Sequence, residues 1–192
     1  MSSAKFYNTF SFLYPIIDLF IGNHKKLLAQ HINDLPGNSL LEIGVGNGSH
    51  LNLYRNKKIT AIDTSTAMLN AAQNRNPNTE CLVMDGGNLT FSDNIFDSAV
   101  LCHVLAVTDN PDRMLSEAYR VVTNRGYIII LNHFTPDNIL GYVDRILSPV
   151  SKLLKLRSVF KQQDLDLSKL TMVKEINIGR FSYFKLLILQ KP

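Results

Sequence analysis

The segment Leu40–His50, LLEIGVGNGSH, constrains the fold of this chain more than any other stretch. An apolar run that contains an acid, Glu42, leads into three alternating glycines, Gly44, Gly46 and Gly48. This pattern is typical of a buried strand that turns sharply into a helix, and many α/β proteins hold a cofactor at such a turn. The segment therefore predicts an α/β fold with a cofactor at the end of its first strand.

The rest of the chain alternates apolar runs of strand length with helical segments, as expected for a parallel sheet with crossover helices. We expect strands at 39–43, 59–62, 81–84, 98–102 and 127–131, and helices at 48–54, 65–74 and 111–122. Asn110 should cap the last of these helices, with Pro111 at its first position. Two more strand-like runs, 171–178 and 181–189, are separated only by Gly179 and Arg180, which predicts an antiparallel hairpin.

The expected fold is a Rossmann-like α/β seven-stranded sheet, with five parallel strands plus a C-terminal hairpin, flanked by helices. We expect one domain over 1–192, in which 1–36 forms an N-terminal helical lid or membrane-contacting segment. Pro15 should divide the aromatic-rich segment 6–21 into two short helices, because an interior proline costs about 3 kcal/mol. Further helices are expected at 23–35, at 138–147 and from Pro149.

The longest apolar stretch, Phe10–Ile21, is interrupted by polar residues and proline and is shorter than the roughly 20 residues of a spanning helix. The start of the chain does not resemble a signal peptide. The two cysteines fall in expected strands, and no His/Cys cluster has metal-ligand spacing. We therefore expect a cytoplasmic protein without disulfides or metal.

The net charge of +4 is matched by one local cluster of bases. Residues 148–161 contain four bases and no acids: Lys152, Lys155, Arg157 and Lys161. Such a patch predicts either an anionic partner, such as a membrane surface, phosphorylated ligand or nucleic acid, or an ordinary solvated helix face.

Two cofactor classes fit the glycine turn poorly. A P-loop ends in Gly-Lys-Ser/Thr, whereas Gly48 is followed by Ser49 and His50. The NAD fingerprint would place its third glycine at position 49, which is serine, so that reading is weakened. An acid at the end of the second strand, Asp63, nineteen positions after Gly44, can accept hydrogen bonds from both ribose hydroxyls of an adenosine cofactor.

The pattern Glu42–Gly48 resembles the first motif of class I S-adenosylmethionine-dependent methyltransferases. The segment VMDGGNLTF after the third strand resembles the family segment in which an acid, here Asp85, meets the adenine amino group. The resemblance implies S-adenosyl-L-methionine as the cofactor, bound through residues at the ends of the first three strands: Glu42, Gly44, Gly46, Gly48, Asp63, Asp85 and Gly86.

Three stretches, LPGNSLLEIGVGNGSHLNLY, FDSAVLCHVLAVTDNPDRMLSEAYRVV and GYIIILNHF, are similar to small bacterial phosphatidylethanolamine N-methyltransferases. Two departures stand out: Ile17-Asp18 replaces an expected Tyr-Asp pair, and Asn124-Arg125-Gly126 replaces Pro-Gly-Gly. The first casts doubt on a tyrosine's role there, and the second is a turn variation.

Methyl transfer to an amine requires that the amine be positioned and unprotonated. His103 and His133 follow the fourth and fifth strands and are the candidate catalytic residues, through which a proton could leave the amine. Aromatic faces of Tyr14, Phe10 and Phe134 could contact methylated cations. For the N-terminal aromatics Tyr14 and Phe10, core packing is the alternative. The candidate substrate-binding residues are Tyr14, Asn132, Phe134 and Arg180, the last as a partner for a lipid phosphate.

The expected partners are a phospholipid or another small amine acceptor, with peripheral contact to an anionic inner membrane surface. A small-molecule or quinone methyltransferase is the main alternative, since a fold does not fix the substrate. An NAD-binding oxidoreductase or a non-catalytic cofactor-binding regulator is a further one. Nucleic acid is an unfavoured substrate, because no Asn/Asp-Pro-Pro-aromatic motif follows the fourth strand, which runs into Cys102-His103-Val104.

Overall fold

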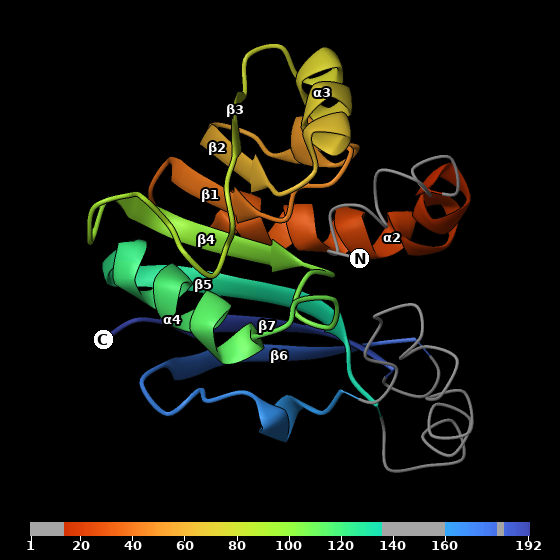
Figure 1. The fold of residues 1–192 in the computed structure, drawn as a ribbon. Helices are drawn as coiled ribbons and strands as arrows, with labels where there is room; N and C mark the ends of the chain where they lie inside the picture. The colour runs from red at the N-terminus through yellow and green to blue at the C-terminus, as the bar shows by residue number, and fades with distance from the viewer. Residues whose placement is uncertain (1–13, 136–159, 180–182) are drawn as a thin grey trace.

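The computed structural model describes residues 14–135, 160–179 and 183–192, and no side chain before residue 23. Within these ranges seven strands form a single sheet in the order β3-β2-β1-β4-β5-β7-β6 (Figure 1). The strands are β1 (Ser39–Ile43), β2 (Lys58–Asp63), β3 (Glu80–Val83), β4 (Phe96–Cys102), β5 (Val122–His133), β6 (Thr171–Ile178) and β7 (Phe184–Gln190).

The first five strands are parallel, and the C-terminal pair is antiparallel. β1 pairs with both β2 and β4, and β4 pairs with β5. β7 runs antiparallel to both β5 and β6. The predicted seven-stranded Rossmann-like sheet is therefore confirmed. The carboxyl ends of the parallel strands meet at one edge, where such sheets bind ligands.

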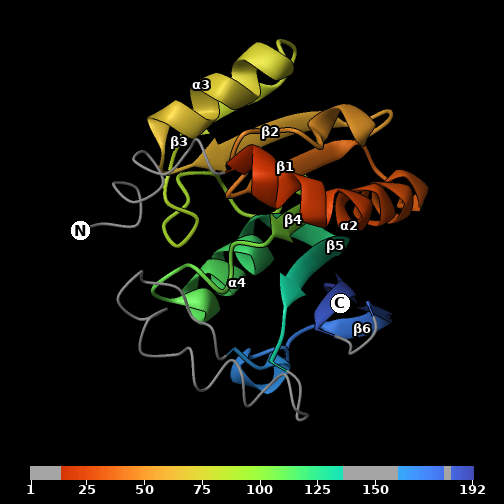
Figure 2. The ribbon, with the colours of Figure 1, turned by 90° about the vertical axis from the view of Figure 1, so that its right-hand side faces the viewer.

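Helices cover both faces of the sheet (Figure 2). α4 (Pro111–Val121) packs on one face through Met114, Leu115 and Ala118, which join the core around Ile43. The opposite face is covered by α2 (Tyr14–Asp34) and α3 (Thr66–Arg75), with Leu28, Ile32, Leu69 and Ala72 in a second core. Two short 3₁₀ helices, η2 (Leu51–Leu53) and η3 (Gln162–Asp164), complete the described elements.

The predicted N-cap of α4 is confirmed, because the Asn110 side chain accepts a hydrogen bond from the backbone N–H of Arg113 at 3.0 Å. The strand Val122–His133 begins earlier than predicted and runs through the Asn124-Arg125-Gly126 departure without interruption. The strand β7 begins at Phe184, three residues later than expected.

One helix prediction is wrong. The expected helix over 48–54 is only the 3₁₀ helix η2, because Gly44, Gly46 and Gly48 all have positive φ and the chain is still turning. Pro15 is the second residue of α2, where its missing N–H has no helical partner to lose. The predicted division of 6–21 at this proline depends on residues before Tyr14, which lie outside the described residues. The helix expected at 23–35 is the C-terminal part of α2.

Several other predictions fall outside the described residues. These are the N-terminal segment before Tyr14 and the helices expected at 138–147 and from Pro149. Among the described helices, none is long and apolar enough to cross a membrane.

Candidate functional site

The glycine turn follows β1 at the carboxyl edge of the sheet. Gly44 has φ +72°, and a Cβ there would lie 2.5 Å from Cγ2 of Val104. Gly48 has φ +64°, and its Cβ would lie 2.8 Å from that of Ala72. At these two positions the protein's own packing already requires glycine.

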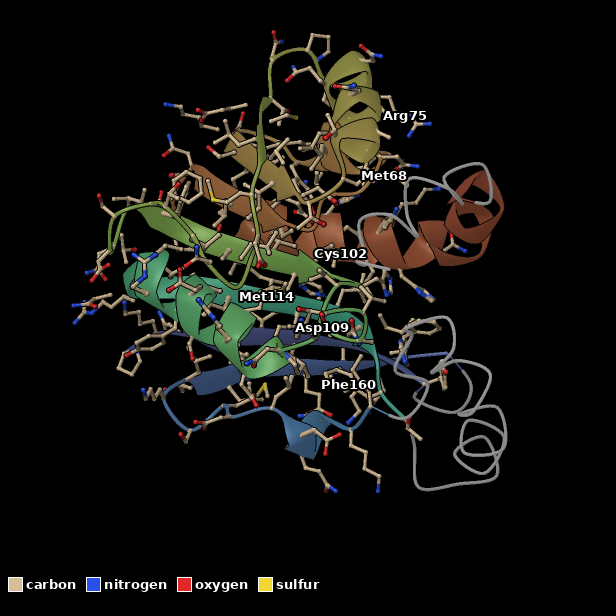
Figure 3. All side chains as sticks on the ribbon, viewed as in Figure 1. Met68, Arg75, Cys102, Asp109, Met114 and Phe160 are labelled. Carbon is tan, nitrogen blue, oxygen red and sulfur yellow. The ribbon has the colours of Figure 1, made fainter. Side chains whose placement is uncertain are left out.

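α3 fixes the turn from its outer side. The Arg75 guanidinium donates to the carbonyl oxygen of Asn47 at 3.0 Å, and the Asn76 side-chain amide donates to that of Gly48 at 2.9 Å. Figure 3 shows Arg75 and Met68 projecting from this helix. These two hydrogen bonds therefore hold the turn in shape from the side of α3.

Glu42 lies beneath the turn rather than on its surface. Its side chain is fully buried, with one oxygen accepting a hydrogen bond from the Tyr54 hydroxyl at 3.1 Å and the other 3.0 Å from Nε2 of His50. Burial and the adjacent Glu42 raise the pKa of Tyr54 well above its ordinary value. This arrangement gives Glu42 a bracing position, and direct contact with the cofactor stays a prediction.

Asp63 ends β2 and is half-buried beside the turn. One carboxylate oxygen accepts the backbone N–H of Gly46 at 2.9 Å, and the other accepts that of Ser65 at 2.9 Å. Burial raises the pKa of Asp63, and the backbone N–H donors partly offset this. Each carboxylate oxygen can accept a further hydrogen bond, so the side chain fits the ribose-binding role predicted for it.

Asp85 and Gly86 follow β3 at the same edge. The Asp85 side chain is exposed and accepts the backbone N–H of Gly87 at 2.9 Å. Gly86 is buried, and a Cβ there would lie 2.5 Å from Ile43 and 3.0 Å from Met114, which is labelled on α4 in Figure 3. Gly86 thus lets this segment pack onto the end of β1, leaving Asp85 free to face a ligand.

A group of rings lies at the ends of β4 and β7 and on α2. The ring centroid of His103 is 5.6 Å from that of Phe184 and 6.4 Å from that of His24. His24 also lies 4.6 Å from Phe184. Nε2 of His103 and Nδ1 of His24 are buried and have no hydrogen-bond partner among the described residues. Two buried imidazole nitrogens without partners are expected where a polar ligand binds.

Burial, reinforced by the positive charge of Lys25, lowers the pKa of His103 to about 3. The ring is therefore neutral at physiological pH. A general base is most effective when its pKa lies near the working pH. The site thus favours His103 as a hydrogen-bond acceptor that orients a ligand, rather than as a group that stores a proton.

The other predicted acceptor residues lie in different surroundings. His133 stacks on Tyr183, with ring centroids 5.6 Å apart. Asn132 is fully buried, and its amide donates to the His133 carbonyl oxygen at 2.8 Å. Phe134 is in the core and stacks on Phe160, so its contact with a substrate stays a prediction. Phe160 is labelled in Figure 3. Arg180 and the side chain of Tyr14 lie outside the described residues.

Sequence reasoning missed several residues that the structure brings to the site: His24, Lys25, His50, Tyr54, Tyr183 and Phe184. Lys25 could have been found from the phase of its helix. It lies three residues before Leu28 and seven before Ile32, on the buried stripe of α2. No comparable pattern in the local sequence predicts that Phe184 contacts the rings of His24 and His103.

The described part of the chain contains no group of three or more His, Cys, Asp or Glu side chains that could hold a metal ion. The two cysteines in this part of the chain, Cys81 and Cys102, do not form a disulfide.

Comparisons with known proteins agree with this site. A family described as a methyltransferase domain matches residues 41–130. The phosphatidylethanolamine N-methyltransferase of Cereibacter sphaeroides is 34% identical over 144 residues, which are 71% of this chain and 70% of that enzyme. The demethylmenaquinone methyltransferase of Thermotoga maritima is 28% identical over 117 residues, 59% of this chain and 51% of that enzyme.

The fold is also shared with solved structures. An S-adenosylmethionine-dependent methyltransferase from Thermotoga maritima has a TM-score of 0.78 at 22% identity, covering 98% of this chain and 99% of that one. The fold and the edge formed by the glycine turn, Asp63 and Asp85 define an enzyme with an adenosine-containing cofactor. This chain belongs to the class I S-adenosylmethionine-dependent methyltransferases.

Proposed function

We propose that this enzyme methylates the amine head group of phosphatidylethanolamine, in the direction of phosphatidylcholine. The observation that carries the proposal is the 34% identity to the Cereibacter sphaeroides phosphatidylethanolamine N-methyltransferase, over 70% of that enzyme's length.

The ring group supports an amine acceptor. An amine attacks only when it is unprotonated, so a site without a negative charge that would stabilise the ammonium form is favourable. The pKa of His103, about 3, keeps this ring neutral, and its buried Nε2 can accept a hydrogen bond from an amine N–H. Such a bond would orient the amine lone pair toward the methyl group, which S-adenosylmethionine supplies as an electrophile when bound.

Aromatic faces support repeated methylation. Each added methyl group makes the product cation bulkier and less well suited to a carboxylate, so aromatic faces become the better partners. Phe184 and Tyr183 lie edge to face, with centroids 5.2 Å apart, and contact His103 and His133 respectively. These rings could take the role for which Phe10 and Tyr14 were the candidates from sequence.

For a lipid acceptor we further propose peripheral binding to an anionic membrane surface. The groups that would attract it are the four bases Lys152, Lys155, Arg157 and Lys161, together with Arg180 as the partner of a lipid phosphate. Lys161 belongs to the described residues, and the other four do not.

The second candidate acceptor is a quinone precursor, favoured by the similarity to the demethylmenaquinone methyltransferase. The two acceptors are separated by incubating the purified protein with S-adenosylmethionine bearing a deuterated methyl group. One reaction receives vesicles of phosphatidylethanolamine and phosphatidylglycerol, one receives phosphatidylglycerol alone, and one receives a demethylated naphthoquinone in detergent.

Mass spectrometry should then find the label on phosphatidylethanolamine only. Label on the naphthoquinone and none on the lipid would replace the proposal with the quinone reaction. An Asp63→Ala variant provides the background reaction.

A further inference from the structure

Lys25 is a buried lysine that points at the glycine turn. It comes from the middle of α2, far from the turn in sequence, and its side chain is only 8% exposed. Its ammonium donates to the hydroxyl of Ser49 at 3.0 Å. The backbone N–H of Ser49 in turn donates to the Asn47 side chain at 3.1 Å, so the serine is itself held in the turn.

The position of Lys25 relates the turn to the acceptor rings. After burial, the charge of Lys25 is the largest influence on the pKa of His103, so the ammonium lies within electrostatic reach of that ring. Lys25 therefore contacts the glycine turn and acts electrostatically on the His103 ring. The amino-acid portion of a cofactor that delivers a methyl group to the acceptor must occupy the same region.

Lys25 and Arg75 both contact the turn, but they do so in different ways. Arg75 is exposed and donates to a backbone carbonyl, that of Asn47, from α3. Lys25 is buried, lies on a different helix, α2, and donates to the side-chain hydroxyl of Ser49. A buried ammonium interacts strongly with an anion placed beside it, because little water screens the pair.

We infer that Lys25 binds the α-carboxylate of the amino-acid portion of S-adenosylmethionine, with Ser49 as its neighbour in the turn. S-adenosylhomocysteine carries the same carboxylate and is a non-reacting probe of the site. Charge-assisted hydrogen bonds of this kind contribute enough that losing one lowers affinity about tenfold or more.

The test is calorimetry with two ligands that differ in the amino-acid portion. The first is S-adenosylhomocysteine, and the second is methylthioadenosine, which has the nucleoside but no carboxylate. Lys25→Met should lower the affinity for the first about tenfold or more and leave that for the second within about twofold. Lys26→Met, at the exposed neighbouring position, and Arg75→Met should leave the preference between the two ligands unchanged.

Three results would overturn the inference. They are unchanged binding of S-adenosylhomocysteine by a folded Lys25→Met variant, equal weakening of both ligands, and loss of the preference in Arg75→Met instead. If Lys25→Met does not fold, Lys25→Arg should keep the preference. The wild-type enzyme should also bind the decarboxylated analogue of S-adenosylhomocysteine at least about tenfold more weakly, and equal affinity would contradict a carboxylate site. Failure of the wild type to bind either adenosine ligand would instead overturn the cofactor site as a whole.

Discussion

Asp63 joins three parts of the cofactor site through one carboxylate. It ends β2, accepts the N–H of Gly46 in the turn and accepts the N–H of Ser65, the N-cap of α3. Each carboxylate oxygen can accept a further hydrogen bond, and the cofactor ribose is the partner predicted for Asp63. Replacing Asp63 should therefore weaken cofactor binding even in a variant that still folds.

We predict that Asp63→Ala lowers the affinity for S-adenosylhomocysteine at least several-fold, because a lost charged hydrogen bond costs roughly 1.5 to 3 kcal/mol. Calorimetry measures this, and circular dichroism checks that the variant is folded. Asp34→Ala, an exposed acid at the end of α2, is the matched control. Wild-type affinity in a folded Asp63→Ala variant would remove Asp63 from the site.

His103 and His133 are predicted to act on the acceptor. His103→Asn and His133→Asn should each lower kcat while leaving cofactor affinity within about twofold, since a contact made mainly at the reaction step is lost. Asparagine is the suitable replacement for His103, whose φ of +57° it tolerates better than most residues. Full activity in both variants would leave proton removal to solvent.

His103 should also make the fold sensitive to acid. Its pKa of about 3 lies below the ordinary value of 6.5, so the unfolded chain takes up this proton first as the pH falls. Stability is therefore lost between those two pH values, by up to about 1.4 kcal/mol per pH unit. We expect His103→Asn to unfold at a lower pH than the wild type in a circular-dichroism titration. An unchanged or higher midpoint would mean that the His103 ring is not buried in its neutral form.

At the scale of single elements, the predicted central strands β1, β4 and β5 came from apolar runs that the sheet buries, whereas the edge strands β3 and β6 are partly or mostly exposed. β1 was predicted with its observed bounds, and its residues from Leu40 to Ile43 are all buried. The helix predicted after Gly48 failed because three positive φ angles keep the chain turning until η2. Pro15 lies in the first turn of α2, a position that proline tolerates.

The acceptor side was only partly predictable. The positions of His103 and His133 follow from strand order, because residues after parallel strands gather at one edge. The contributions of His24 and Lys25 depend on how α2 packs against loops 24 or more residues away, as in the bond from Lys25 to Ser49. The periodicity of the sequence can show that a residue is buried, but it does not indicate which distant residue it contacts.

The cap of α4 gives a prediction at this scale. Asn110→Ala removes the side-chain acceptor of the Arg113 N–H and should destabilise the protein by about 1 kcal/mol, seen as a lower Tm. Asn74→Ala, at an exposed position within α3, is the control and should change stability by less than about 0.5 kcal/mol. Equal effects of the two substitutions would contradict the capping role.

At the scale of the whole molecule, the question is how the enzyme reaches a lipid. The bases Lys152, Lys155, Arg157 and Lys161 should each add about 1 kcal/mol of attraction to an anionic surface, and apolar side chains of the N-terminal segment would enter the interface. We predict co-sedimentation with vesicles that contain acidic lipid, weakened by salt and by changing the four bases to glutamine. Equal co-sedimentation with neutral and acidic vesicles at low and high salt would contradict membrane binding. It would instead favour an N-terminal segment that acts as a lid and a cluster of bases that is an ordinary solvated surface.

The most direct test of the account is the lipid composition of a host that lacks phosphatidylcholine and expresses this enzyme. Mass spectrometry of the extracted lipids should detect mono-, di- or trimethylated phosphatidylethanolamine with the wild type and none with Asp63→Ala. The extent of methylation would show how many groups the site accepts. If the wild-type protein binds S-adenosylhomocysteine in vitro but produces no methylated phosphatidylethanolamine in these cells, the lipid assignment is contradicted.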